Sequence, residues 1–150
     1  MLTLLLTLVA QVAPADRPPA NPAAIAAQAV EHQKAGRLGE AADAYERFLD
    51  LVPTSWEAHS NLGVIYAQLG RHEDAVLEYR EALAIQPGQV AVRYNLALAL
   101  YKAARVGAAA AELEKVLASA PNHAQAPLLL ADCHLQLGHW TEVIAILDPL

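Results

Sequence analysis

The sequence predicts an all-α fold built as a tandem array of repeats, and two observations support this. The first is a set of landmarks that recur every 34 residues, which marks a repeat architecture. The second is the composition: the chain is 55% hydrophobic but only 5% aromatic, and the excess is mostly alanine and leucine, which favour helix. The landmarks are Pro53, Pro87 and Pro121; Gly36, Gly70 and Gly138; Ala41, Ala75 and Ala109; and Tyr45 and Tyr79, followed in register by Leu113 and Leu147.

The copy at residues 56–89 carries the fullest set of landmarks, namely Leu62, Gly63, Tyr66, Gly70, Ala75, Tyr79, Ala82 and Pro87. The pattern resembles tetratricopeptide repeats, in which a helix–turn–helix motif recurs along the chain. The resemblance implies a right-handed superhelical solenoid of antiparallel helix pairs with a concave groove. It divides the array, residues 22–150, into repeats at 22–55, 56–89 and 90–123 and a partial repeat at 124–150.

Residues 1–15 differ from the array and are interpreted as a bacterial-type signal peptide. An apolar run, Leu2 to Ala10, precedes small residues at Ala13 and Ala15 in an A-x-A cleavage pattern. The run is too short for a membrane span, which takes about 20 apolar residues. We therefore expect an exported protein, periplasmic or secreted, with a proline-rich linker at 16–21. A disordered leader is the alternative, since no Lys or Arg precedes the apolar run.

In the first repeat we expect helices at about 22–35 and 38–51. Pro22 suits a first helical turn, where the missing N–H costs nothing. Gly36 suits the left-handed residue after a helix end, and Pro53 disfavours helix at the residue before it.

The second repeat follows the same pattern with stronger landmarks. Gly63 and Ala75 are expected to be small because the two helices of the repeat approach closely there. Tyr66 and Tyr79 are expected to fill the space between repeats.

The third repeat departs from the pattern, because Ala104 stands where the other copies have glycine. A left-handed Ala104 would cost about 1–2 kcal/mol. Gly107 could relieve this cost by shifting the turn.

In the fourth repeat we expect a helix around 124–137 and another from about Trp140, with Thr141 as its cap. Repeat arrays usually end in a helix with a polar outer face, and this one does not. We expect either that the chain is part of a longer array or that a partner, including a second copy, covers the exposed apolar seam.

The tetratricopeptide resemblance places the first helix of each repeat along the concave groove. Asn61 and Asn95 are equivalent there, and an amide can both donate to and accept from a peptide backbone. The alternative is that asparagine is simply common at this position. Tyr94, Tyr101 and Lys102 could form an aromatic and basic contact patch, with Tyr101 expected at the surface. The candidate groove residues are Ser60, Asn61, Gln68, Tyr94, Asn95, Tyr101 and Lys102.

Composition and motifs argue against several functions. The net charge of -6 disfavours nucleic-acid binding. Cys133 is the only cysteine, so the chain lacks an internal disulfide pair. The six histidines contain no HExxH motif; Cys133, His134 and His139 lack helical i, i+4 spacing, so no metal or other cofactor is predicted. No catalytic grouping is seen, so we do not expect an enzyme. The acidic residues of the second helices, Glu78 among them, are interpreted as a solvated outer face.

The sequence therefore predicts a scaffold that binds a peptide segment of a partner protein in its concave groove. The chaperone-tail clamp of this family is not expected, because Ala26, Val30, Ala91 and Asn95 depart from its pattern. Two alternatives stay open. One is a repeat region of a longer chain with a catalytic or assembly region downstream, and the other is self-association through the last repeat.

Overall fold

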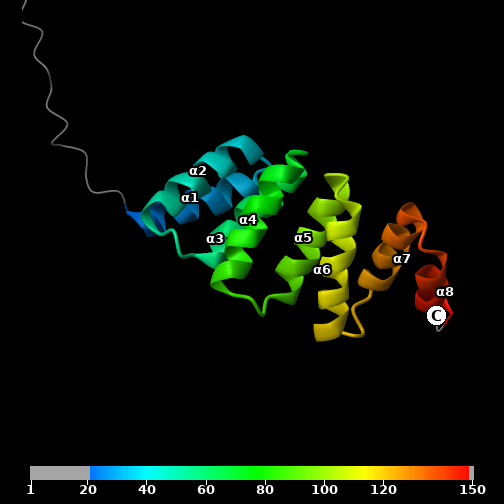
Figure 1. The fold of residues 1–150 in the computed structure, drawn as a ribbon. Helices are drawn as coiled ribbons and strands as arrows, with labels where there is room; N and C mark the ends of the chain where they lie inside the picture. The colour runs from blue at the N-terminus through cyan, green and yellow to red at the C-terminus, as the bar shows by residue number, and fades with distance from the viewer. Residues whose placement is uncertain (1–20, 149–150) are drawn as a thin grey trace, which may run out of the picture.

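The computed structural model describes residues 21–148, and these form four consecutive helix pairs (Figure 1). The pairs are α1 (Pro22–Lys34) with α2 (Leu38–Leu51), α3 (Trp56–Gln68) with α4 (His72–Ile85), α5 (Val90–Lys102) with α6 (Val106–Ser119), and α7 (Ala126–Leu137) with α8 (Trp140–Leu147). The signal peptide predicted at 1–15 and nearly all of the linker lie outside the described residues.

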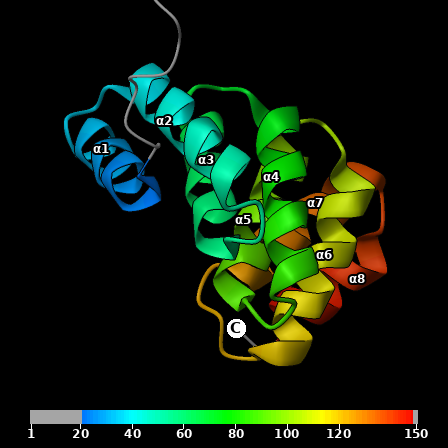
Figure 2. The ribbon, with the colours of Figure 1, turned by 90° about the vertical axis from the view of Figure 1, so that its left-hand side faces the viewer.

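The helix pairs stack in chain order into an extended array. Each helix packs against the next one, and α3 also contacts α5 across the intervening helix. Figures 1 and 2 show the pairs turning progressively from α1–α2 at one end to α7–α8 at the other. The expected all-α solenoid is confirmed. Among the described residues, no helix is both long and apolar enough to cross a membrane.

Two helix starts are capped by the side chain that precedes them. Asn21 Oδ1 accepts the Ala23 amide at 3.0 Å, and Ser55 Oγ accepts the Ala58 amide at 3.2 Å. Each contact satisfies an amide that has no partner within the helix. Asn21 thus belongs structurally to α1 rather than to the preceding linker.

The turn inside every helix pair is closed in the same way. Gly36, Gly70 and Gly138 have φ values of 72°, 75° and 75°, and Ala104 adopts the same left-handed conformation at 58°. In each turn the amide that follows this residue donates to a carbonyl five residues back, as in Arg105 to Leu100 at 2.8 Å. The expectation that Gly107 shifts the third turn is wrong: Gly107 lies within α6, and Ala104 bears the strain.

The core consists mainly of alanine and leucine and also contains buried tyrosines. Gly63 is small for a specific reason: a Cβ there would lie 2.7 Å from Cε1 of Tyr79. Gly63 on α3 therefore faces the Tyr79 ring on α4 within one repeat. The close approach expected at this glycine is thus one between the α3 backbone and a side chain of α4. Tyr66 does bridge repeats, because its hydroxyl donates to Glu46 on α2.

Two details of the fourth repeat differ from expectation. Helix α7 begins at Ala126 rather than near Ala124, and His123 Nδ1 accepts the Ala126 amide at 3.2 Å, which caps the later start. Helix α8 begins at Trp140, so Thr141 is inside the helix and is not its cap. The Thr141 hydroxyl donates instead to Glu142 at 2.6 Å.

The second helices are not merely solvated on their acidic face. Glu78 on α4 lies 2.7 Å from Nδ1 of His59, whose Nε2 is 3.1 Å from the Pro53 carbonyl oxygen. This contact ties the proline turn to the second helix and corrects the interpretation of Glu78. In the next repeat, Arg93 makes the equivalent contacts, to the Pro87 carbonyl oxygen at 3.0 Å and to Glu112 at 2.8 Å.

Replacing Ala104 with glycine is expected to stabilise the protein. The left-handed alanine costs about 1–2 kcal/mol, and glycine's greater freedom in the unfolded chain offsets about 0.4–1 kcal/mol of the gain. Ala104→Gly should therefore raise the free energy of unfolding by roughly 0.5–1 kcal/mol, measured by urea denaturation.

The matched control is Gly70→Ala, since a Cβ at Gly70 would meet no atom within 4 Å. Its effect is then conformational only and should have the opposite sign. A loss of stability in Ala104→Gly would contradict the strain inferred at this turn.

Candidate functional site

A pocket of about 160 Å³ opens between the second and third repeats. Three consecutive helices line it: α3 contributes Ala67, α4 contributes His72 and Tyr79, and α5 contributes Asn95, Leu98, Ala99 and Lys102. A cavity of about 150 Å³ can hold a benzene-sized group, so this pocket has room for one peptide side chain.

The helical period explains why α5 supplies most of the lining. Asn95, Leu98, Ala99 and Lys102 are spaced i, i+3, i+4 and i+7, so they share one face of the helix. Ala67 contributes only a methyl group from α3. The small alanines leave the space that the pocket occupies.

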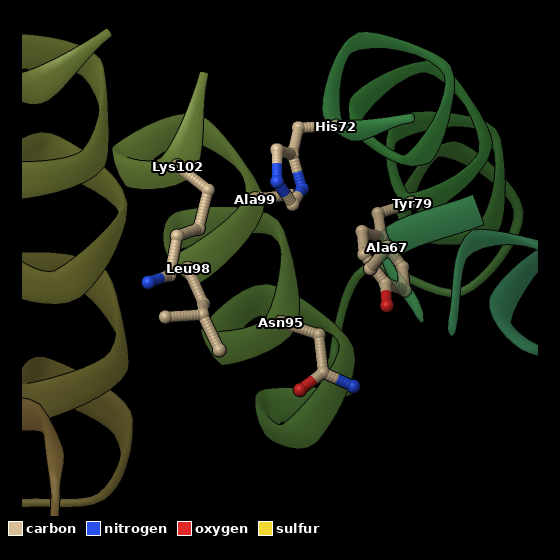
Figure 3. A pocket seen from close by; sticks show the side chains of 7 residues that line it. All are labelled: Ala67, His72, Tyr79, Asn95, Leu98, Ala99 and Lys102. Carbon is tan, nitrogen blue, oxygen red and sulfur yellow. The ribbon is translucent and has the colours of Figure 1, made fainter. Parts of the chain in front are cut away.

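The pocket joins apolar walls to a few hydrogen-bonding groups. Figure 3 shows the His72 ring, the Tyr79 ring and the Asn95 amide around one space, with the Lys102 ammonium beside Leu98. Burial raises the pKa of Tyr79, so its hydroxyl keeps its proton. His72 Nδ1 is buried and finds no hydrogen-bond partner among residues 21–148. A buried polar atom without a partner costs free energy, and a ligand with a matching polar group would remove that cost.

Asn61 and Asn95 are equivalent in sequence but differ in their contacts. Asn61 Nδ2 donates to the Tyr45 hydroxyl at 3.2 Å, and that hydroxyl donates to Gln33 at 3.4 Å. Tyr79 stands in the place of Tyr45 beside Asn95, yet no hydrogen bond of the Asn95 side chain is found in the described part of the chain. The Asn95 amide is therefore available to a ligand, whereas the Asn61 amide is partly engaged.

The two predicted groove tyrosines contact the fourth repeat. The Tyr94 ring packs at a tilt of 34° against His123, with ring centroids 4.6 Å apart. Tyr101 is half-buried; it donates to Asp132 and accepts from Gln136 at 2.6 Å. The structure thus ties these aromatic side chains to α7 and its preceding loop, and of the predicted aromatic and basic patch only Lys102 lines the pocket.

The remaining predicted residues lie on α3 away from the pocket lining. Ser60 is half-buried and Gln68, the last residue of α3, is exposed. Neither side chain forms a hydrogen bond within residues 21–148. They are open for contact with a ligand, but the structure does not join them to Asn95 and Lys102.

Sequence reasoning missed His72 and Tyr79 as pocket residues because both come from a second helix. A signal for His72 was present, since the equivalent positions in the other repeats are apolar: Leu38, Val106 and Trp140. A polar residue at a position that is otherwise apolar indicates a local departure from simple core packing.

Metal and thiol chemistry have little support at this pocket, whose lining within the described residues contains no cysteine, aspartate or glutamate. Across residues 21–148, no three His, Cys, Asp or Glu side chains are grouped as they stand to hold a metal ion. Cys133 is fully buried, and burial raises the pKa of its thiol to about 11. A thiol in that state is a poor nucleophile at neutral pH.

Comparison with known proteins places this architecture among described families. Tetratricopeptide repeat family models match residues 26–90 and residues 100–150. Protein O-mannosyl-transferase F38B6.6 of Caenorhabditis elegans is 34% identical over 65 residues, which cover 43% of this chain. The match covers 9% of the mannosyl-transferase, so this chain corresponds to a small part of that protein.

Solved structures with the same fold share little sequence with the chain. MamA AMB-1 matches with a TM-score of 0.81 and 21% identity over 85% of this chain and 70% of that one. The first tetratricopeptide domain of Spaghetti (RPAP3), bound to the HSP90 peptide SRMEEVD, matches with a TM-score of 0.69 and 20% identity. That match covers 78% of this chain and 95% of the domain, and at such identities it establishes the fold alone.

Proposed function

The chain belongs to the tetratricopeptide repeat family, and from this premise we propose that it binds a peptide segment of a partner protein between its second and third repeats. Members of this family generally act as non-catalytic scaffolds, and the fold is that of a protein-interaction scaffold. The observation that carries the finer proposal is the pocket lined by Tyr79, Asn95 and Lys102.

The chemistry of the pocket defines the segment it fits. The apolar walls favour a side chain with an aliphatic or aromatic body, which gains by leaving water. The Asn95 amide can pair with the peptide backbone next to the residue whose side chain enters the pocket. Lys102 at the rim adds a positive charge that favours an acidic neighbour.

A related fold with a peptide bound, the first tetratricopeptide domain of Spaghetti (RPAP3), supports the mode of binding proposed for this chain. The proposal does not extend to the same peptide. Ala26, Val30 and Ala91 stand where a clamp for such a tail would need polar or basic side chains.

The test is a peptide-display selection against the full chain, followed by affinity measurements on the selected peptides with two variants. Ala67→Leu fills the pocket and should abolish measurable binding. Asn95→Ala removes one hydrogen-bonding group and should weaken binding by about fivefold, as expected for a loss of roughly 1 kcal/mol.

Asn61→Ala is the matched control, because it is the same change at the equivalent position, where the amide is already engaged by Tyr45. It should leave peptide affinity within about threefold, below the effect of one net hydrogen bond. Unchanged affinity in both Ala67→Leu and Asn95→Ala would rule out the pocket as the binding site.

A second candidate function, association with another copy of the chain, is favoured by the surface of the last repeat. No residue of α8 within the described part is buried, and Leu128, Trp140 and Ile144 are 60%, 63% and 66% exposed. Large apolar side chains exposed on one repeat are the composition expected of an interaction site. We propose that this surface of α7 and α8 stacks on a second copy of the chain.

Sedimentation velocity across a range of concentrations tests the association. The unmodified chain should associate as its concentration rises, and Ile144→Asp should return it to a monomer, because a charge cannot be buried cheaply in an apolar contact. Leu77→Asp on α4, where the side chain is 58% exposed, is the control and should not change association. A monomer at every concentration of the unmodified chain would exclude the idea.

Export is also part of the proposal. Its support is the apolar run from Leu2 to Ala10 and the small residues Ala13 and Ala15. After expression of the full chain in a bacterium, mass spectrometry of the periplasmic fraction should find a mature protein beginning at Asp16. Ala15→Tyr should block processing at that site, and recovery of the intact chain only in the cytoplasmic fraction would refute export.

A further inference from the structure

The turns of the four repeats carry side chains at three equivalent positions, the eleventh, sixteenth and nineteenth of each repeat. The sixteenth is arginine in the first three repeats and histidine in the fourth. The sets are His32, Arg37 and Glu40; Tyr66, Arg71 and Asp74; Leu100, Arg105 and Ala108; and His134, His139 and Glu142.

The first turn shows how close these three positions come. Arg37 Nε donates to His32 Nδ1 at 3.0 Å and lies 2.7 Å from Glu40 Oε2. The same Glu40 oxygen is 3.2 Å from His32 Nδ1. Side chains at the eleventh, sixteenth and nineteenth positions can therefore meet at one point.

The fourth turn places two imidazoles at that point. Nδ1 of His134 and Nδ1 of His139 are 3.2 Å apart, and the ring centroids are 5.5 Å apart. Arginine offers only donors, whereas a neutral imidazole nitrogen offers a lone pair. The change from arginine to His139 therefore replaces a positively charged side chain with an imidazole whose nitrogen faces that of His134.

The spacing of the two nitrogens suits a shared metal ion. Zinc–nitrogen bonds of about 2.0–2.1 Å at tetrahedral angles put two ligand nitrogens about 3.3–3.4 Å apart. The observed separation needs little adjustment to reach that value. His134 is 9% exposed and held by α7, so one ligand is fixed, while exposed His139 leaves the pair open to solvent.

Glu142 stands at the nineteenth position of the fourth repeat and would become a third ligand by a change of side-chain rotamer. Its carboxylate now accepts the Thr141 hydroxyl at 2.6 Å. That hydrogen bond, chiefly, lowers the pKa of Glu142, and the nearby His139 and His134 lower it further. Glu40, at the equivalent position of the first repeat, shows that a carboxylate there reaches the eleventh and sixteenth side chains.

We propose that His134, His139 and Glu142 form a binding site for a divalent first-row transition-metal ion at the turn between α7 and α8. Two imidazole nitrogens and a carboxylate are suitable ligands for such ions. Both rings then carry their proton on Nε2, and the hydrogen bond between the two Nδ1 atoms gives way to two metal bonds. The remaining coordination positions face solvent.

The test uses the full chain without a polyhistidine tag, Zn²⁺ in equilibrium dialysis and Co²⁺ as an absorption probe. One equivalent of metal is expected to bind. His139→Arg restores the residue that the first three repeats carry, so the variant should fold, and the site should be lost. Loss of an outer-shell partner costs about 10–100-fold in metal affinity, so Glu142→Gln, which removes a direct ligand, should cost at least tenfold.

Two variants of the first turn complete the design. His32→Tyr introduces the residue of the second repeat and should leave metal binding unchanged. Arg37→His gives the first turn the same three side chains as the fourth and should add a second equivalent of bound metal. The proposal is overturned if the unmodified chain binds neither ion, if His139→Arg binds as the unmodified chain does, or if Arg37→His adds no site. Circular dichroism on each variant confirms the helical fold.

Discussion

Stacking of neighbouring helix pairs is the interaction on which the rest of this structure depends. One helix pair cannot bury its apolar face alone, so each repeat completes its core with the next. The contacts α2 with α3, α4 with α5 and α6 with α7 provide this burial. The same constraint explains the last repeat, where α8 has a neighbour on one side only within the described residues and Trp140, Ile144 and Leu147 stay exposed.

The seams between repeats also form the pocket at which we propose binding. The pocket lies where α3 and α4 of one repeat meet α5 of the next, and its shape depends on a residue outside its lining. Gly63 admits the Tyr79 ring at a distance that a Cβ would forbid, and the ring forms one wall of the pocket. Packing within the second repeat therefore sets the volume of the pocket between the second and third repeats.

Equivalent positions in a repeat array do not have equivalent chemistry. Asn61 is engaged by Tyr45, whereas Asn95 lines a pocket. The four inner turns share one backbone geometry, but their side chains give an ion pair with arginine in the first repeat and two facing imidazoles in the fourth. A fixed backbone with variable turn residues therefore gives different side-chain chemistry at equivalent points of the array.

The sequence by itself determined the helical array, because the turn glycines and the prolines are local signals that act within one or two helical turns, and the 34-residue period repeats them along the chain. It also identified Asn95 and Lys102, which follow the groove-facing period of a first helix. Only the tertiary structure decided that His72 and Tyr79 join them, that Tyr101 is tied to Asp132, and that His134 meets His139 at i, i+5 spacing across a turn. Those contacts depend on how helices cross and how a left-handed turn redirects the chain. Periodicity along one helix carries no information about either.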